Sequence, residues 1–278
     1  MDEQTLKVII ISDLHIVPDG QLSHSLDTTD RLNQCIEFIN NNHDDVDFVV
    51  FGGDLADHGE VKAYQRLKET YGSLKSPSYL TLGNHDKSEN FLEIFGQIQS
   101  TETGKFDHYV DIKQHRIIIL DSSCSRYSAA GYLEKIQLAW LREKLTEARG
   151  RPVIIILHHN FVDAHVKTGN IILKNNVEFA NLIVECHPEI RQVISGHIHM
   201  TTSGFYRGVP FSTLAGSHYN IEPTLKYADS RLMPPVPRRE GPGQIAVILS
   251  NKDSTVVHMM NFIDRHLPMA QELFGGYD

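Results

Sequence analysis

Five short polar clusters contain the residues of this chain whose types and spacing could perform chemistry. Each cluster carries histidine, aspartate or asparagine, and each directly follows a short apolar run. One cluster alone is a weak signal, because Asp-x-His and His-x-His arise by chance and a lone histidine is often structural. All five together indicate one site assembled from distant segments. The clusters span residues 12–15, 52–59, 83–86, 158–160 and 195–199.

The side chains in these clusters suit divalent transition metals. One residue separates Asp13 from His15, so both point the same way in an extended chain, and His197 and His199 repeat this spacing. Mixed oxygen and nitrogen ligands favour Mn, Fe, Zn, Co or Ni over Ca or Mg, and the thiolates of structural zinc are missing. The candidate ligands are Asp13, His15, Asp54, Asn84, His158, His197 and His199.

Seven ligands are too many for one such ion, but they make two incomplete shells if Asp54 is shared as a bridge. Two divalent ions would exceed the charge of Asp13 and Asp54 by roughly +2, which would acidify a bound water and hold an anion. Two neighbouring metals can hold the attacking and leaving oxygens of an in-line displacement at phosphorus. The residues therefore indicate chemistry at a phosphate ester.

The elements that must position these clusters follow from the apolar pattern. Runs rich in Ile and Val, without polar alternation, are typical of strands buried on both faces. Between them, apolar residues recur at helical spacing, as at Leu32, Cys35, Ile36 and Ile39, with Asp30 as the expected cap. This alternation predicts an α/β architecture, in which ligands bind at the carboxyl ends of the strands. The runs are 8–11, 48–51, 79–82, 117–120, 153–157 and 193–194, and the other helical segments are 64–74, 91–98, 140–145 and 177–184.

The last part of the chain has a different pattern. Residues 244–250 and 255–263 predict a β-hairpin, and residues 221–243 hold five of the eleven prolines without a helical or strand period. We expect a long loop there, either a plain surface connection or a lid, substrate-shaping or dimer-contact segment. No linker divides the chain, so we expect a single domain over residues 1–278.

Composition limits the partners and the location. The 278 residues carry a formal net charge of −9, which disfavours stable nucleic-acid binding but is compatible with a small anionic substrate at a metal site. The 16 histidines are many for this length. Cys35, Cys124 and Cys186 are too widely spaced for a disulfide framework, which favours reduced thiols in the cytoplasm. The apolar run 8–11 is too short for a signal peptide, and no segment could span a membrane.

In their order and spacing, the clusters resemble the motifs of the calcineurin-like metallophosphoesterase superfamily. The resemblance extends from Asp13 to His199 and is strongest for class III cyclic nucleotide phosphodiesterases and their glycerophosphodiesterase relatives. It rests on the stretches Gly-Asp-Leu-Ala-Asp at 53–57, Gly-Asn-His-Asp at 83–86 and the pair His158-His159. It implies a four-layer αββα sandwich of two mixed sheets, whose second sheet the late hairpin would complete.

The resemblance also implies roles for individual residues. Asp13, His15 and His199 would hold the first of two divalent or mixed-valence metals, such as Mn, Fe or Zn. Asp54 would bridge, and Asn84, His158 and His197 would hold the second metal. His85 would contact the phosphate and assist the leaving oxygen. By analogy with other carboxylate–histidine pairs, Asp86 would orient it. Asp54, Asn84 and His85 thus form the expected catalytic set.

Several nearby residues have less definite roles. Asp57 and His58 could line the site, although hydrogen bonding within their own loop is the favoured interpretation. His159 is equally compatible with a place behind the ligands and with facing the substrate. His218 and Phe161 are candidates for the substrate pocket, and His24, His43 and His266 are expected on the surface.

The leading hypothesis is a phosphodiesterase that cleaves a small diester, of the cyclic nucleotide or glycerophosphodiester class, by attack of a metal-bridging hydroxide. Two departures bear on it: Asn160 and Phe161 replace the prolines often found after the paired histidines, and His58 stands where protein phosphatases carry arginine. Alternatives are a phosphomonoesterase acting on a nucleotide or sugar phosphate, a nuclease, or a non-enzymatic scaffold. The family resemblance also makes a homodimer possible.

Overall fold

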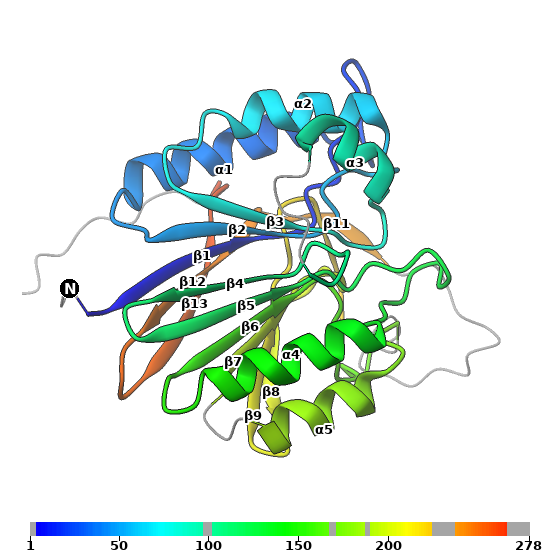
Figure 1. The fold of residues 1–278 in the computed structure, drawn as a ribbon. Helices are drawn as coiled ribbons and strands as arrows, with labels where there is room; N and C mark the ends of the chain where they lie inside the picture. The colour runs from blue at the N-terminus through cyan, green and yellow to red at the C-terminus, as the bar shows by residue number, and fades with distance from the viewer. Residues whose placement is uncertain (1–3, 97–101, 167–170, 187–189, 224–236, 266–278) are drawn as a thin grey trace, which may run out of the picture.

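Two mixed β-sheets packed face to face form the centre of the structure, a computed structural model that describes residues 4–96, 102–166, 171–186, 190–223 and 237–265 (Figure 1). Helices cover the outer face of each sheet, so the layers follow the order helices, sheet, sheet, helices. This is the αββα sandwich that the family resemblance implies.

The first sheet has the strand order β13-β12-β1-β2-β3. Its parallel part consists of β1 (Leu6–Ile11), β2 (Phe48–Gly52) and β3 (Ser78–Thr81). The C-terminal hairpin, β12 (Gln244–Ser250) and β13 (Thr255–Asn261), pairs antiparallel with β1 through β12. The hairpin therefore extends the sheet that begins the chain, not the sheet formed by the later strands.

The second sheet has the order β4-β5-β6-β7-β9-β8. Its four inner strands are mutually parallel, and β4 and β8 pair antiparallel at the two edges. The apolar runs do not predict these edge strands, because their residues alternate between exposed and half-buried. The strands are β4 (His108–Ile112), β5 (His115–Leu120), β6 (Val153–Leu157), β7 (Ile190–Ser195), β8 (Thr202–Tyr206) and β9 (Val209–Thr213).

Three helices, α1 (Thr28–Asn42), α2 (Val61–Tyr71) and α3 (Ser88–Phe95), cover the first sheet (Figure 1). The second sheet is covered by α4 (Lys135–Glu147) and α5 (Asn176–Cys186). None of the described helices has the length and apolar character needed to cross a bilayer.

The start of α1 differs from the sequence prediction. The Asp27 carboxylate accepts the backbone N–H groups of Thr29 and Asp30, so Asp27 is the cap and Asp30 lies in the first helical turn. At the other end of the helix, His43 is buried, which corrects the expectation that it lies on the surface. His24 is exposed as expected, and His266 lies outside the described residues.

The central strands are apolar on both faces because each sheet is covered on both sides. Ile9 and Ile11 of β1 pack toward the helices, whereas Val8 and Ile10 pack against the second sheet. The same alternation divides β5 between the inter-sheet core and the core under α4 and α5. These strands therefore read as continuous apolar runs in the sequence.

A short ladder, β10 (Tyr219–Ile221) with β11 (Arg238–Glu240), occupies part of the segment expected to be a loop. That expectation was wrong for residue 221 and residues 238–240, and residues 224–236 lie outside the described part. Buried Arg31 of α1 anchors this region, because its guanidinium donates to the carbonyl oxygens of Ser217 and Gly241, both at 2.6 Å.

We expect Ile154→Ala to lower the free energy of unfolding by about 2–5 kcal/mol, since Ile154 is fully buried between the sheets and the change leaves a cavity. The matched control is Ile136→Ala on α4, where the side chain is 53% exposed and the change should stay within about 0.5 kcal/mol. Denaturant unfolding measures both. Equal losses would contradict the assignment of Ile154 to a packed core.

Candidate metal centre

All five polar clusters lie at the carboxyl ends of parallel strands. Asp13 and His15 follow β1, Asp54 follows β2, and Asn84 and His85 follow β3. From the other sheet, His158 directly follows β6, and the cluster containing His197 and His199 follows β7. The carboxyl ends of these strands lie on the right in Figure 1, so the five clusters begin at the same end of the sandwich.

The first group of side chains consists of Asp13, His15 and His199, whose potential ligand atoms lie within 4.8 Å of one another. The Nε2 atoms of His15 and His199 are 3.3 Å apart, and His199 Nε2 lies 3.5 Å from an Asp13 carboxylate oxygen. All three residues are buried. Two lone pairs and a carboxylate converge here on one point.

Asp54 lies between this group and the next. Its Oδ2 atom is 3.2 Å from His158 Nε2 and 3.7 Å from His15 Nε2, while Oδ1 accepts the backbone N–H of His85 at 2.9 Å. The Asp54 side chain is 2% exposed, and no lysine or arginine forms an ion pair with it among the described residues. This carboxylate therefore faces imidazoles of both groups.

The second group contains His158, His159 and His197, whose ring nitrogens also lie within 4.8 Å of one another. Two buried atoms here, Asn84 Oδ1 and His159 Nε2, have no hydrogen-bond partner within the described chain. Buried polar atoms without partners are costly, and they are expected where a ligand belongs. His159, whose role the sequence left open, thus has an available nitrogen beside two expected ligands.

Hydrogen bonds behind the rings fix which nitrogen each histidine presents. His158 Nδ1 donates to the Gly52 carbonyl at 3.0 Å and His199 Nδ1 to the Tyr219 carbonyl at 2.9 Å. His15 Nδ1 donates to the Asp57 carboxylate at 3.0 Å. In each ring Nε2 therefore faces the centre, and it offers a lone pair there when the ring is neutral.

His197 is held the other way round, because its Nε2 donates to the carbonyl oxygen of Ile171 at 2.8 Å. Its Nδ1 remains as the potential ligand. The backbone N–H of His197 donates to Asp13 at 3.0 Å, which connects the loop after β7 with the loop after β1.

Burial and the nearby carboxylates determine the protonation states of these histidines. Burial lowers the pKa of His197 and of His199 to about 4, so both are neutral near pH 7, the form that binds metals. Burial alone would lower the pKa of His158 as well, but the Asp54 carboxylate outweighs it and raises this pKa to about 9. Without a metal, a proton on His158 would balance the charge of Asp54. The donor set and its orphaned atoms fit divalent transition metals.

The backbone is turned sharply at these positions. Asp13, His15, Asp54, His197 and His199 all have positive φ, between 48° and 71°. Side-chain-bearing residues rarely adopt this left-handed conformation, and each instance costs about 1–3 kcal/mol. Such strain is concentrated at functional sites, and here it aims side chains from strand ends at a common point.

Glycines at two strand ends allow the loops to approach each other closely. A Cβ atom on Gly83 would collide with Asp54 Oδ1 and lie 2.8 Å from His158 Cδ2. A Cβ atom on Gly196 would collide with Ser12 Oγ and with the Asp13 carboxylate. These positions therefore admit no side chain while the site keeps its geometry.

His85 and its neighbours differ from expectation. Asp86 does not orient the His85 ring, because its carboxylate accepts the backbone N–H groups of Gly83, Leu55 and Ala56 and the Tyr64 hydroxyl. This network fixes the loops after β2 and β3 instead. The backbone carbonyl of Asp57 holds the His85 ring, by accepting its Nδ1–H at 2.6 Å.

Asp57 was expected to form hydrogen bonds within its own loop, and the structure corrects this expectation. Its carboxylate binds His15 Nδ1 and accepts the Ser23 hydroxyl at 2.8 Å, so it orients an expected ligand. Sequence spacing alone carries no signal for this contact, because it joins two different strand-end loops. His58, in contrast, is largely exposed.

The two residues expected in the substrate pocket, Phe161 and His218, lie in different environments. Phe161 packs in the core beneath α5 against Phe179, so it is not available to a substrate. His218 is buried with its ring centroid 4.8 Å from that of His15, and its Nδ1 has no hydrogen-bond partner among the described residues. His218 therefore belongs to the centre.

Comparison with known proteins bears directly on this geometry. The model of the calcineurin-like phosphoesterase family matches residues 6–201, which is more than half of the chain and includes every expected ligand. The chain belongs to the calcineurin-like phosphoesterase family. The structure of this phosphoesterase is consistent with that family, since its candidate His/Asp metal sites combine residues from both sheets.

Several proteins similar in sequence to this phosphoesterase are named as phosphodiesterases. It is 28% identical to a probable cyclic nucleotide phosphodiesterase of Rhodopseudomonas palustris, over 93% of each chain. A probable cyclic nucleotide phosphodiesterase of Synechococcus is 34% identical over 77% of this chain and 80% of its own. A probable glycerophosphodiester phosphodiesterase of Arcobacter nitrofigilis is 29% identical over 79% and 81%, respectively.

Among solved structures, a dimetal phosphatase from Danio rerio has a TM-score of 0.64 at 13% identity and covers 91% of this chain and 98% of its own. A purple acid phosphatase from yellow lupin has a TM-score of 0.66 at 12% identity, covering 95% of this chain and 52% of its own. At such identities these likenesses establish the fold alone.

We expect Gly83→Ala to lower the metal content of the purified phosphoesterase, because the added methyl group displaces the Asp54 carboxylate. Gly72→Ala is the control, since a Cβ atom there meets its nearest neighbour at 3.4 Å. Elemental analysis gives the metal per chain. Wild-type content in Gly83→Ala would show that Asp54 has room to move without losing a metal.

Asp57→Asn should weaken Mn²⁺ binding by about 10–100-fold, because it removes the charge that supports His15 while keeping a hydrogen-bond acceptor. Competition with a chelator measures the affinity, and Asp44→Asn on the surface is the matched control. Unchanged affinity in Asp57→Asn would remove Asp57 from the description of the metal centre.

Proposed function

We propose that this phosphoesterase is a dinuclear-metal phosphodiesterase that cleaves a small diester of the cyclic nucleotide or glycerophosphodiester class. The observation that carries the proposal is the position of Asp54, one carboxylate facing imidazoles of two groups. A shared carboxylate suits two adjacent metals, and two metals suit in-line displacement at phosphorus.

The residues divide naturally between two ions. Asp13, His15 and His199 would hold one, and the other would lie among the second set of ligands, with Asp54 shared between them. The second set is Asn84, His158 and His197, with the free nitrogen of His159 beside them. When bound, such ions polarise the phosphoryl oxygens and lower the pKa of water.

His85 is the proposed acid or hydrogen-bond donor toward the leaving oxygen. Its side chain is 37% exposed, whereas those of His15 and His158 are at most 1% exposed, so a substrate can reach it. Because the Asp57 carbonyl binds Nδ1–H, Nε2 is the atom that remains for the substrate. An imidazole can supply a proton near neutral pH.

The relatives named above support a diester substrate, since their names describe phosphodiesterases. The loop after Asp54 adds to this: exposed His58 stands where an arginine would grip a dianionic monoester. A phosphomonoesterase acting on a nucleotide or sugar phosphate is the second candidate, because the same ligand set could also serve it.

Location and assembly belong to the same proposal. Cys35 and Cys124, the two cysteines whose side chains are described, are both free thiols, which supports a cytoplasmic location. A homodimer is the assembly we propose by analogy with the family.

The function is tested by comparing hydrolysis of bis(p-nitrophenyl) phosphate and p-nitrophenyl phosphate by manganese-loaded protein. We expect the diester to react faster, and we expect Asn84→Ala to lose orders of magnitude of that rate because the second metal loses a ligand. Asn181→Ala on α5 is the matched control and should retain the rate.

A faster monoester rate would replace the diesterase with the second candidate. Wild-type rates in Asn84→Ala, with metal bound, would refute the assignment of Asn84 to the second metal. Elemental analysis of each variant separates loss of metal from loss of chemistry.

A further inference from the structure

A large cavity lies at the end of the sandwich opposite the metal centre. Its volume is about 920 Å³, within the range of small-molecule sites. It is lined by residues that precede β1, β6 and β7 or begin them, together with the β4–β5 and β12–β13 turns. Because the parallel strands begin at this end, their full length lies between the cavity and the metal centre.

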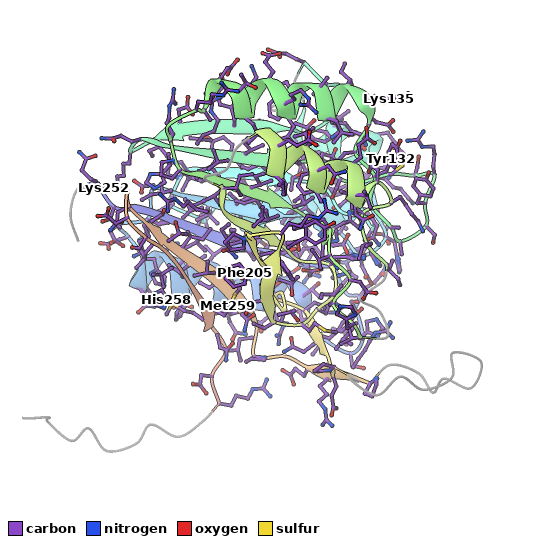
Figure 2. All side chains as sticks on the ribbon, turned by 90° about the horizontal axis from the view of Figure 1, so that it is seen from below. Tyr132, Lys135, Phe205, Lys252, His258 and Met259 are labelled. Carbon is purple, nitrogen blue, oxygen red and sulfur yellow. The ribbon has the colours of Figure 1, made fainter. Side chains whose placement is uncertain are left out.

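Figure 2 shows this separation. Lys252, in the β12–β13 turn that lines the cavity, lies on the opposite side of the molecule from Tyr132. Tyr132 follows Gly131, where an added Cβ atom would collide with the His159 ring of the metal centre. The proposed function uses no residue that lines this cavity.

The cavity is positively charged in an acidic protein. Four cationic side chains line it against two carboxylates, Asp111 and exposed Asp253, so the lining carries a net charge of +2 while the chain carries −9. The four cations are Lys113, Arg151, Arg191 and Lys252. A concave surface of one sign concentrates ions of the opposite sign.

Two of these cations are already neutralised. Lys113 Nζ lies 2.8 Å from the Asp47 carboxylate, and Arg151 Nη1 lies 2.8 Å from the Asp111 carboxylate. Within the described parts of the chain, no carboxylate forms an ion pair with Arg191 or Lys252. Arg191 and Lys252 therefore remain for a ligand, beside one carboxylate, Asp253, in the same turn.

Arg191 is partly buried and held in place. Its Nη2 donates to the Lys252 carbonyl at 3.0 Å, while its Nε is buried without a hydrogen-bond partner among the described residues. An unpaired buried N–H of a guanidinium is costly, and a bound anion would satisfy it. Guanidinium groups bind phosphate oxygens through two parallel N–H donors.

We propose that this cavity binds a small phosphomonoester, with Arg191 and Lys252 holding its phosphate. A phosphomonoester carries about −1.5 to −2 charges at pH 7, so it would pair with both cations, and exposed Asp253 would have to point away from it. The volume far exceeds that of inorganic phosphate, so the organic part of the ligand also has room. The site is independent of the metal centre and of the reaction proposed there.

Calorimetric titration of the full chain with AMP and with glycerol 3-phosphate tests the site. Each titration is run on metal-loaded protein and on protein stripped by a chelator. We expect one phosphomonoester to bind per chain after stripping, with a Kd at least about tenfold weaker in Arg191→Gln and in Lys252→Gln. Exposed Lys252 tests the site without risk to folding, and Arg207→Gln in the β8–β9 turn is the matched control.

Binding of both ligands would show that the site recognises the phosphate group. Binding of AMP alone would show that it recognises the nucleoside as well. Either result supports the site. Loss of all binding on stripping would assign it to the metal centre and overturn the proposal. Equal affinity in wild type, Arg191→Gln and Lys252→Gln would also overturn it. Tighter binding of malonate than of either phosphomonoester would overturn the choice of ligand class.

Discussion

The structure depends on two carboxylates, Asp13 and Asp54, that are buried without a lysine or arginine beside them in the described chain. Buried charge is stable only when it is balanced, and here imidazoles surround it. His158 can balance Asp54 with a proton, and a metal can balance both carboxylates more completely. The strained backbone at strand ends, the closely approaching glycines and the hydrogen bonds behind the rings all follow from bringing imidazoles to these oxygens. The fold supplies the necessary direction, because parallel strands from both sheets end on the same side.

Much of this arrangement could be predicted from sequence because it is carried by local pattern. The α/β class follows from apolar runs that alternate with helical stripes, and the ligand candidates follow from polar clusters placed directly behind those runs. Asp57 shows where prediction stops: its partner, His15, lies 42 residues away, and spacing carries no information about a contact between two loops. Edge strands β4 and β8 were missed because one half-exposed face removes the apolar run that marks a central strand. Asp86 misled for a related reason, since analogy with other carboxylate–histidine pairs suggested that it orients His85, whereas its carboxylate binds backbone amides.

The hydrogen bonds behind the rings determine what each histidine can do. A backbone carbonyl holds His158, whereas a carboxylate holds His15, so the latter is the more electron-rich donor. The two halves of the centre therefore differ electronically although both use imidazole. Such asymmetry provides a physical basis for two metals of unequal affinity in one site. The His85 ring packs edge-on against the His15 ring, is held through Nδ1 by the Asp57 carbonyl, and is more open to solvent than the other rings.

The centre draws on both sheets: Asp13, His15, Asp54 and Asn84 come from the first, and the remaining histidines come from the second. Ions bound there would link the two sheets, which also meet through apolar packing and through polar contacts such as Thr81 Oγ1 with the Leu120 carbonyl. At the opposite end, among the described residues, the sheets are joined by side chains alone, through His115 with Ser250 and Lys113 with Asp47. Neither half carries a complete ligand set, so a duplication, swap or truncation of one sheet would leave a fragment unable to keep its metals. A complete centre therefore requires both sheets in one folded molecule.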